Sequence, residues 1–115
     1  MFKAKWTSRA TAEYQELMRA AASARETRRR EGRSKTSRPE GLFKQIDKTI
    51  RLLLANPRHP GLRSHEFTSM RSPYDPLARV FEAYAQNDTS GAYRIFWCYG
   101  PAKGEITILA ITPHP

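Results

Sequence analysis

An apolar stripe at helical spacing, ending at a proline, gives the clearest structural signal in this sequence. Large apolar side chains recur every three or four residues, at Leu42, Phe43, Ile46, Ile50, Leu53 and Leu54. This spacing predicts an amphipathic helix with one buried face. Ser37-Arg-Pro-Glu40 has the form of a capping box with proline in the first turn. Asn56-Pro57 ends the helix, since a residue before proline is pushed out of the helical region.

A strand and a second helix are predicted before this one. Phe2, Ala4 and Trp6 alternate with lysines, which is typical of a short strand with one buried face. From Ser8 to the late twenties the apolar residues recur at helical spacing among good helix formers. Residues 25–38 are dense in arginine and offer nothing to bury, so we expect a frayed helix end running into a flexible basic connector. The two helices would form a hairpin.

The rest of the chain reads as strands. We expect a short strand within residues 62–70, a loop over 71–77, and strands over 80–86, 93–99 and 105–112, with turns at 87–91 and 100–104. Short connections between consecutive strands imply antiparallel neighbours. The predicted fold is a single α+β domain over residues 1–115: an N-terminal strand, a helical hairpin and an antiparallel β-meander, with the helices on one sheet face.

Charge and composition narrow the classes of function. The 115 residues carry a formal charge of +9, and residues 1–38 hold eleven Lys or Arg against four Glu. A hydrophobic content of 39% excludes a wholly disordered polycation, and a single cysteine excludes an internal disulfide and a zinc finger. No apolar run is long enough for a membrane span, and the start lacks a secretory signal, so we expect a soluble, cytoplasmic protein. The basic connector suits a solvated linker, a nucleic-acid phosphate backbone or an acidic protein partner.

Strand parity predicts a mixed surface on the sheet face away from the helices. In the strand over 93–99, Arg94 and Phe96 point away from the side chains next to them in sequence. In the strand over 80–86, Glu82 and Tyr84 can lie on that same face. Apolar residues remain on both faces, which indicates that a partner covers the open one at times.

Four segments resemble the RelE/ParE superfamily of bacterial toxins. They are Phe2-Lys-Ala-Lys-Trp6, residues 52–63, Gly91-Ala-Tyr-Arg-Ile-Phe-Trp97, and the aliphatic strand Ile106-Thr-Ile-Leu-Ala-Ile-Thr-Pro-His114. The resemblance implies the toxic half of a type II toxin–antitoxin pair. In the RelE-like branch such a toxin cuts messenger RNA in the ribosomal decoding site, without metal or cofactor. It also implies an antitoxin partner whose extended segment wraps the toxin.

Metal-free RNA cleavage needs a base for the 2′-hydroxyl proton, cations for the charge on phosphorus and an acid for the leaving 5′-oxygen. Arg94 matches the family's phosphate-contacting arginine, and its planar donors suit two phosphate oxygens. Its alternative role is a cross-strand pair with Glu82. His114 corresponds to the terminal histidine that one subgroup uses as acid or base. Alternatively, His114 is a mobile tail residue.

His65 and Glu66 are further acid–base candidates, of which only one can face the site. Glu82 stands where the type member of the family has lysines, so a lysine-based mechanism is not expected. The residues predicted to contact RNA are Arg58, Arg63, Tyr84 and Phe96, together with Arg28, Arg29 and Arg30 of the connector.

Two other functions stay open at this point. One is a ParE-like toxin that inhibits DNA gyrase and cuts nothing. The other is a nucleic-acid-binding module that uses the arginine-rich connector.

Overall fold

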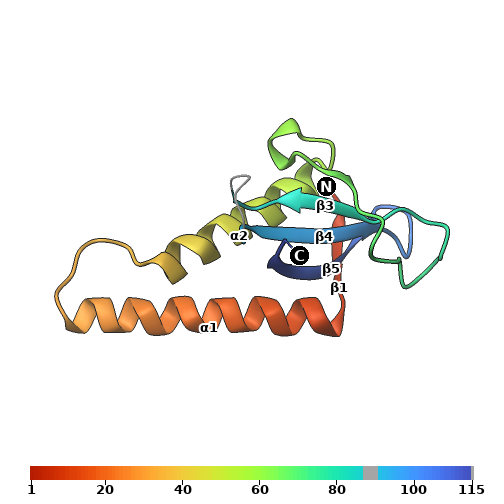
Figure 1. The fold of residues 1–115 in the computed structure, drawn as a ribbon. Coiled ribbons are helices and arrows are strands. Elements are labelled where there is room, and N and C mark those ends of the chain that lie inside the picture. The colour runs from red at the N-terminus through yellow and green to blue at the C-terminus, as the bar shows by residue number, and fades with distance from the viewer. Residues whose placement is uncertain (87–90, 115) are drawn as a thin grey trace.

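A computed structural model describes residues 1–86 and 91–114, so the turn predicted at 87–91 lies almost wholly outside the described residues. The elements follow the predicted order. They are β1 (Lys3–Trp6), α1 (Ser8–Arg30), α2 (Arg38–Ala55), the 3-10 turn η1 (Pro60–Leu62), β2 (His65–Glu66), β3 (Phe81–Tyr84), β4 (Tyr93–Tyr99) and β5 (Glu105–Pro113). The strands form one sheet in the order β1-β5-β4-β3-β2, with both helices on one side (Figure 1). The predicted α+β class is confirmed.

Strands β2 to β5 form the predicted antiparallel meander. β1 is different, because it pairs with β5 in parallel, from Lys3 opposite Glu105 to Trp6 opposite Ile108. Parallel neighbours need a long connection between them, and here both helices and the other strands intervene. The N-terminal strand therefore closes one edge of the sheet beside the last strand of the chain.

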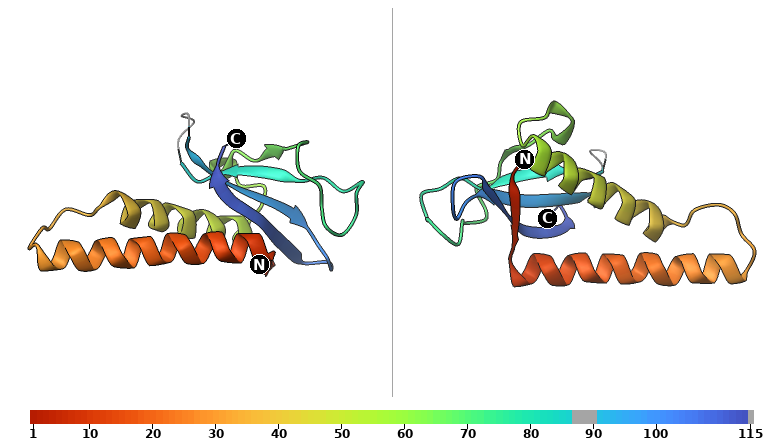
Figure 2. Two further views of the ribbon diagram at one scale, coloured as in Figure 1. Left: turned by 60° about the horizontal axis from the view of Figure 1, so that its bottom comes forward. Right: turned by 180° about the vertical axis from the view of Figure 1, so that it is seen from behind.

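The apolar stripe of α2 forms the centre of the main core. Ile46 and Leu53 are fully buried and pack in one cluster with Ile95 and Trp97 of β4. Burying each such side chain contributes about 1.5–3 kcal/mol. Seen from behind, α2 crosses the sheet, whereas much of α1 extends beyond it (Figure 2).

The start of α1 is fixed to β5 by side chains. Thr7 caps the helix by accepting a hydrogen bond from the Ala10 amide, and its hydroxyl donates to the Leu109 carbonyl at 2.9 Å. Glu13 accepts a hydrogen bond from the Ile111 amide at 2.9 Å. These contacts satisfy polar backbone groups of β5 beyond the end of β1.

The sheet face away from the helices is covered in part by the chain itself. Val80, Phe96 and Leu109 form a second apolar cluster, against which Phe67 and Met70 pack. The strand predicted within 62–70 is therefore only His65–Glu66, because the residues after it leave the sheet edge and fold over this face. The apolar residues here do not require a separate partner to cover them.

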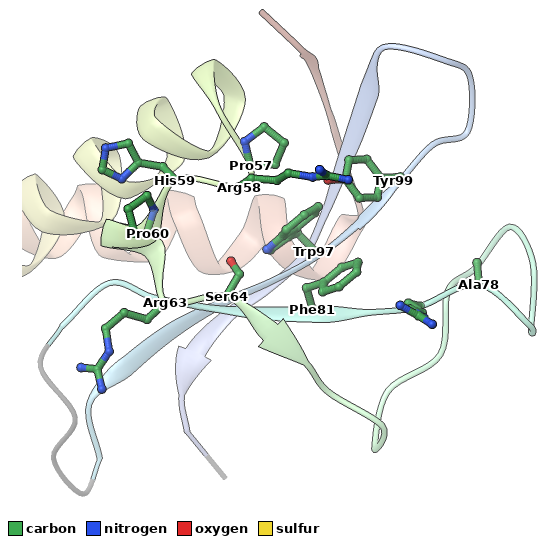
Figure 3. Close-up of a pocket in the computed structure, with 11 residues that line it drawn as sticks. Pro57, Arg58, His59, Pro60, Arg63, Ser64, Ala78, Phe81, Trp97 and Tyr99 are labelled. Atoms are coloured by element: carbon green, nitrogen blue, oxygen red, sulfur yellow. The ribbon is translucent and has the colours of Figure 1, made fainter.

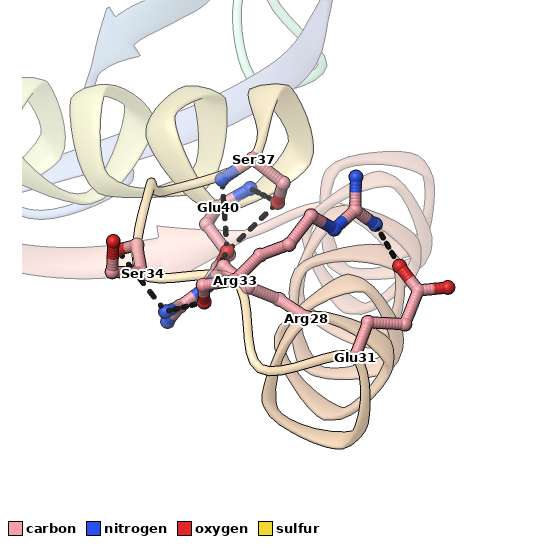
Figure 4. Close-up of polar contacts among 6 residues, drawn as sticks. All are labelled: Arg28, Glu31, Arg33, Ser34, Ser37 and Glu40. Carbon is pink, nitrogen blue, oxygen red and sulfur yellow. Dashed lines mark hydrogen bonds and ion pairs between the residues drawn. The ribbon is translucent and has the colours of Figure 1, made fainter.

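The basic segment is more regular than predicted. α1 continues to Arg30, so a frayed end over 25–30 is wrong, and the connection between the helices is residues 31–37. The contacts of Arg28 account for the regular structure of this segment (Figure 4). Its guanidinium donates to both carboxylate oxygens of Glu40 at 2.9 and 3.0 Å and to the backbone carbonyls of Arg33 and Ser34. Glu40 also completes the predicted capping box with Ser37.

We predict that Ser37→Ala lowers the free energy of unfolding by about 1 kcal/mol, because α2 loses its N-cap acceptor. Urea unfolding followed by circular dichroism measures the change. Ser34→Ala is the matched control, since Ser34 meets Arg28 through its backbone carbonyl. An equal loss in both variants would contradict the role of the cap.

The Glu40 carboxylate also makes stability depend on pH. The bond from Arg28 and the amide of Ser37 lower the pKa of Glu40 from its ordinary 4.5 to about 2. A carboxylate with a lowered pKa stabilises the folded state above its ordinary pKa, and this stabilisation is lost as pH falls through the lower value. Glu40→Gln keeps a capping side chain but removes the charge. We expect it to be less stable than the parent near neutral pH, with the difference shrinking between about pH 4.5 and 2 in unfolding curves measured across that range.

Candidate functional site

A buried carboxylate lies between two imidazoles on the sheet face away from the helices. Glu82 of β3 has no exposed surface. Its Oε2 lies 2.5 Å from Nδ1 of His114, and its Oε1 lies 2.8 Å from Nε2 of His65. The two imidazole side chains are roughly half exposed. The three residues bring together β2, β3 and the end of β5.

Backbone pairing fixes both histidines. His65 stands directly opposite Glu82 in the β2–β3 register. His114 follows β5, and its amide donates to the Ala92 carbonyl at 3.0 Å. The alternative of a mobile tail residue therefore does not apply to His114. The structure also answers which member of the pair His65 and Glu66 faces this cluster, and it is His65.

Hydrogen bonding distinguishes the two imidazoles. Nδ1 of His65 lies 3.3 Å from the Arg63 carbonyl, while Nε2 lies beside the carboxylate, so both nitrogens face acceptors. The Nε2 contact is close but does not have the geometry of a hydrogen bond. To satisfy both contacts with donors, each nitrogen would have to carry a hydrogen. His114 uses Nδ1 toward Glu82, and among the described residues none hydrogen-bonds its Nε2.

Two guanidinium groups lie over one aromatic ring beside this cluster. The Arg94 guanidinium carbon is 3.9 Å from the centre of the Tyr84 ring, and that of Arg63 is 4.6 Å from it. Arg94 stands opposite Tyr84 in the β3–β4 register, whereas Phe96 is the residue opposite Glu82. Contacts of this kind stabilise a cation by about 0.5–2 kcal/mol.

Exposure separates the two arginines. Arg94 lies on the predicted face, but only 2% of its surface is exposed, so the prediction of a guanidinium presented at an open surface is wrong. Arg63 is exposed and follows η1 in a left-handed conformation, with φ of 51°. Arg63 is therefore the exposed one of the two guanidinium groups over Tyr84, and its backbone carbonyl lies beside His65.

Two other predicted site residues take no part in this cluster. Phe96 is 1% exposed and packs against Phe67, with ring centres 4.8 Å apart, so it cannot stack on a base. Glu66 stands opposite Phe81 on the other side of β2, and its carboxylate lies 3.6 Å from Arg79. The alternation of side chains along β4 predicts the sheet face of Phe96 correctly. Its burial could not be predicted, because the loop that covers this face has no repeating pattern in its sequence.

The remaining predicted RNA contacts are spread over the molecule. Arg58 is exposed in the turn after α2. Arg28, Arg29 and Arg30 lie in the last turns of α1, at the end that extends beyond the sheet (Figure 1). Arg28 is engaged with Glu40 there. The tertiary structure does not bring these three to the cluster around Glu82.

Glu82 is the functional candidate that sequence reasoning missed. From the sequence it is expected only as a departure from the family's lysines and as a cross-strand partner for Arg94. The alternation of side chains along β3 indicates the sheet face on which Glu82 lies. The pairing of Glu82 with His65 could not be predicted, because β2 has only two residues and shows no sequence pattern.

Two further findings concern metal ions and membranes. Among residues 1–86 and 91–114, no group of three or more potential ligands is arranged to hold a metal ion. Neither described helix has a segment both long and apolar enough to span a bilayer.

Comparisons with known proteins identify the fold. No protein-family model matches the sequence, and no match is found among curated proteins. Among solved structures, a YoeB/ParE toxin from Agrobacterium tumefaciens is similar, with a TM-score of 0.60 and 12% sequence identity over 98% of this chain and 99% of that chain. The chain therefore has the fold of RelE/ParE-type toxins, as its sequence segments predicted.

We predict that Phe96→Ala lowers the free energy of unfolding by about 3–5 kcal/mol, because it leaves a cavity beneath Phe67. Thermal or urea unfolding measures this loss. Leu77→Ala is the control, since Leu77 is 92% exposed and its truncation should change stability by less than about 0.5 kcal/mol. Similar small effects from both variants would show that Phe96 is not a core residue.

Proposed function

We propose that this protein is the toxin of a toxin–antitoxin pair and that it cleaves messenger RNA at the cluster around Glu82. The observation that carries the proposal is the Glu82 carboxylate in contact with His65 and His114 at once, beside the accessible guanidinium of Arg63. Toxin folds of this type give the general class. The cluster supplies the proton carriers and the cation that cleavage by side chains requires.

His114 acts as the general base. Its Nδ1–H donates to Glu82, which leaves the lone pair of Nε2 for the 2′-hydroxyl proton. The buried carboxylate selects this tautomer and stabilises the imidazolium that forms, as a carboxylate does beside a catalytic histidine. The tie from the His114 amide to Ala92 holds the ring in place near the end of the chain.

The cations stabilise the phosphorane-like transition state. Arg63 reaches the phosphate directly, since its side chain is exposed beside the cluster. Arg94 is a positioning residue, because its buried guanidinium holds the Tyr84 ring from below the surface and adds positive charge to the site. Arg63 and Arg94 both lie over the Tyr84 ring, so this ring holds the two cations close together.

The second proton comes from the His65 imidazolium. The 2′-oxygen attacks phosphorus and the bond to the 5′-oxygen breaks. The Nδ1–H of His65 leaves its 3.3 Å contact with the Arg63 carbonyl and gives its proton to this leaving group. Glu82 contacts both proton carriers, so the charge gained at His114 and lost at His65 stays balanced around one carboxylate. The products are a 2′,3′-cyclic phosphate and a 5′-hydroxyl end.

The partners follow from the same proposal. Messenger RNA on the ribosome is the substrate, and the protein acts in the cytoplasm. A cognate antitoxin binds the protein and inhibits it until the two separate. The chemistry assigned to the side chains uses no cofactor.

We predict that His114→Ala lowers the initial rate of message cleavage by about a hundredfold or more, because it removes the general base. The measurement uses purified protein, ribosomes and a defined message, with 5′ ends mapped after short incubation. Glu82→Gln should also reduce the rate, because an amide can present its N–H to Nδ1 and favour the wrong tautomer.

Glu66→Gln is the matched control, since this carboxylate points to the other side of β2 beside Arg79. It should cleave like the parent protein. Parental rates in both His114→Ala and Glu82→Gln would refute the site. DNA damage with intact messages after induction would instead favour the gyrase-inhibiting alternative.

A further inference from the structure

A cavity opens on the side of the β2–β3 edge opposite the Glu82 cluster. Its volume is about 700 Å³, within the usual range for small-molecule sites. The turn after α2 forms one wall and strands β3 and β4 form the floor (Figure 3). None of the proposed proton carriers lines this cavity. The cavity therefore adjoins the cleavage site, with which it shares Arg63 and the same edge of the sheet.

Three aromatic rings form a corner in the cavity. Phe81 and Trp97 are stacked, with ring centres 4.7 Å apart and planes 25° apart. Tyr99 stands nearly perpendicular to both, at 81° to Phe81 and 80° to Trp97. Tyr99 is 43% exposed, so it offers a ring surface to a planar ligand. Stacking on an exposed aromatic ring is how proteins commonly hold a nucleobase.

Two buried polar atoms in the cavity have no hydrogen-bond partner among the described residues. They are Oγ of Ser64 and Nε1 of Trp97, whose side chain is only 1% exposed. In Figure 3 the indole nitrogen of Trp97 points to the side of the cavity where Ser64 lies. An indole N–H can only donate, whereas a serine hydroxyl also accepts. Neither atom is exposed to solvent, so neither presents a donor to a ligand in the cavity, but the indole N–H of Trp97 reports on the cavity wall.

The charged side chains that line the described part of the cavity are arginines. Arg58 extends over its mouth in the view of Figure 3, and no carboxylate of the described residues lies within ion-pair distance of it. Arg79 also lines the cavity and is 3.6 Å from Glu66. Guanidinium groups favour an anion with several acceptor oxygens, and phosphate meets this description.

We infer that this cavity is a nucleotide subsite, which binds one nucleotide of single-stranded RNA next to the cleaved linkage. The base stacks on Tyr99, and the phosphate takes the charge of Arg58. An acidic peptide fits less well, because a carboxylate leaves the aromatic corner unused. The inference rests on the proposed function for the identity of the polymer.

Chain geometry connects this subsite to the cleavage site. Ser64 and His65 are consecutive, yet Ser64 lines the cavity and His65 contacts Glu82 on the other face. Adjacent residues of extended chain point to opposite faces. The β2 edge is only two residues long, so one RNA strand crossing it reaches both sites.

The two tryptophans make the subsite directly observable. Isotope-labelled protein shows one indole N–H signal each for Trp6 and Trp97, and Trp6→Phe assigns them. On addition of adenosine monophosphate we expect the Trp97 signal to shift to saturation while the Trp6 signal stays in place. No shift of the Trp97 signal at millimolar nucleotide would overturn the inference. An equal response to inorganic phosphate alone, or a tighter one to a glutamate-rich peptide, would also overturn it.

Variants test the individual contacts. Tyr99→Ala should weaken nucleotide binding about tenfold or more, since it removes the stacking surface. Tyr74→Ala is the matched control at another exposed tyrosine and should bind as the parent does. Equal affinity in Tyr99→Ala and the parent would contradict the subsite. Trp97 shifts in a protein that cleaves no message would refute only the proposed function, whereas cleavage with a silent Trp97 signal would refute only the subsite.

Discussion

The burial of one carboxylate is the constraint on which the candidate site depends. Glu82 is fully enclosed, and removing a charged carboxylate from water is costly unless charge and hydrogen bonds compensate it. His65 and His114 provide this compensation from two other segments of the chain. Because both histidines contact the same group, the carboxylate helps to orient both rings. Backbone pairing of β2 with β3 and of His114 with Ala92 brings the two histidines to Glu82.

One face of the sheet carries the main core, and the other carries the candidate site. Apolar packing with α2 occupies the centre of one face, and the loop carrying Phe67 and Met70 covers part of the other. What remains accessible lies around the β2–β3 edge, with the imidazoles on one side and the aromatic corner on the other. The proposed cleavage and nucleotide sites adjoin because a two-residue edge strand is too short to separate them.

Local polar contacts stabilise the long helical arm. Arg28 and Glu40 join the end of α1 to the start of α2, and Glu40 serves the helix cap at the same time. One carboxylate thus orders a connection of seven residues that is rich in charge and poor in apolar side chains. The arginines of this arm lie at the far end of the molecule from Glu82, which keeps them outside the proposed chemistry.

The sequence by itself determined the helices, the order of the strands and the face on which Glu82, Tyr84 and Arg94 lie, because periodicity, capping residues and prolines act over a few neighbouring positions. It also identified His65 and His114 as candidates from their side-chain chemistry. Only the tertiary structure decided that both contact Glu82, that Arg94 and Phe96 are buried, and that β1 pairs in parallel with β5. Those outcomes depend on segments far apart in the chain, and on a covering loop without any repeat, so no local pattern records them.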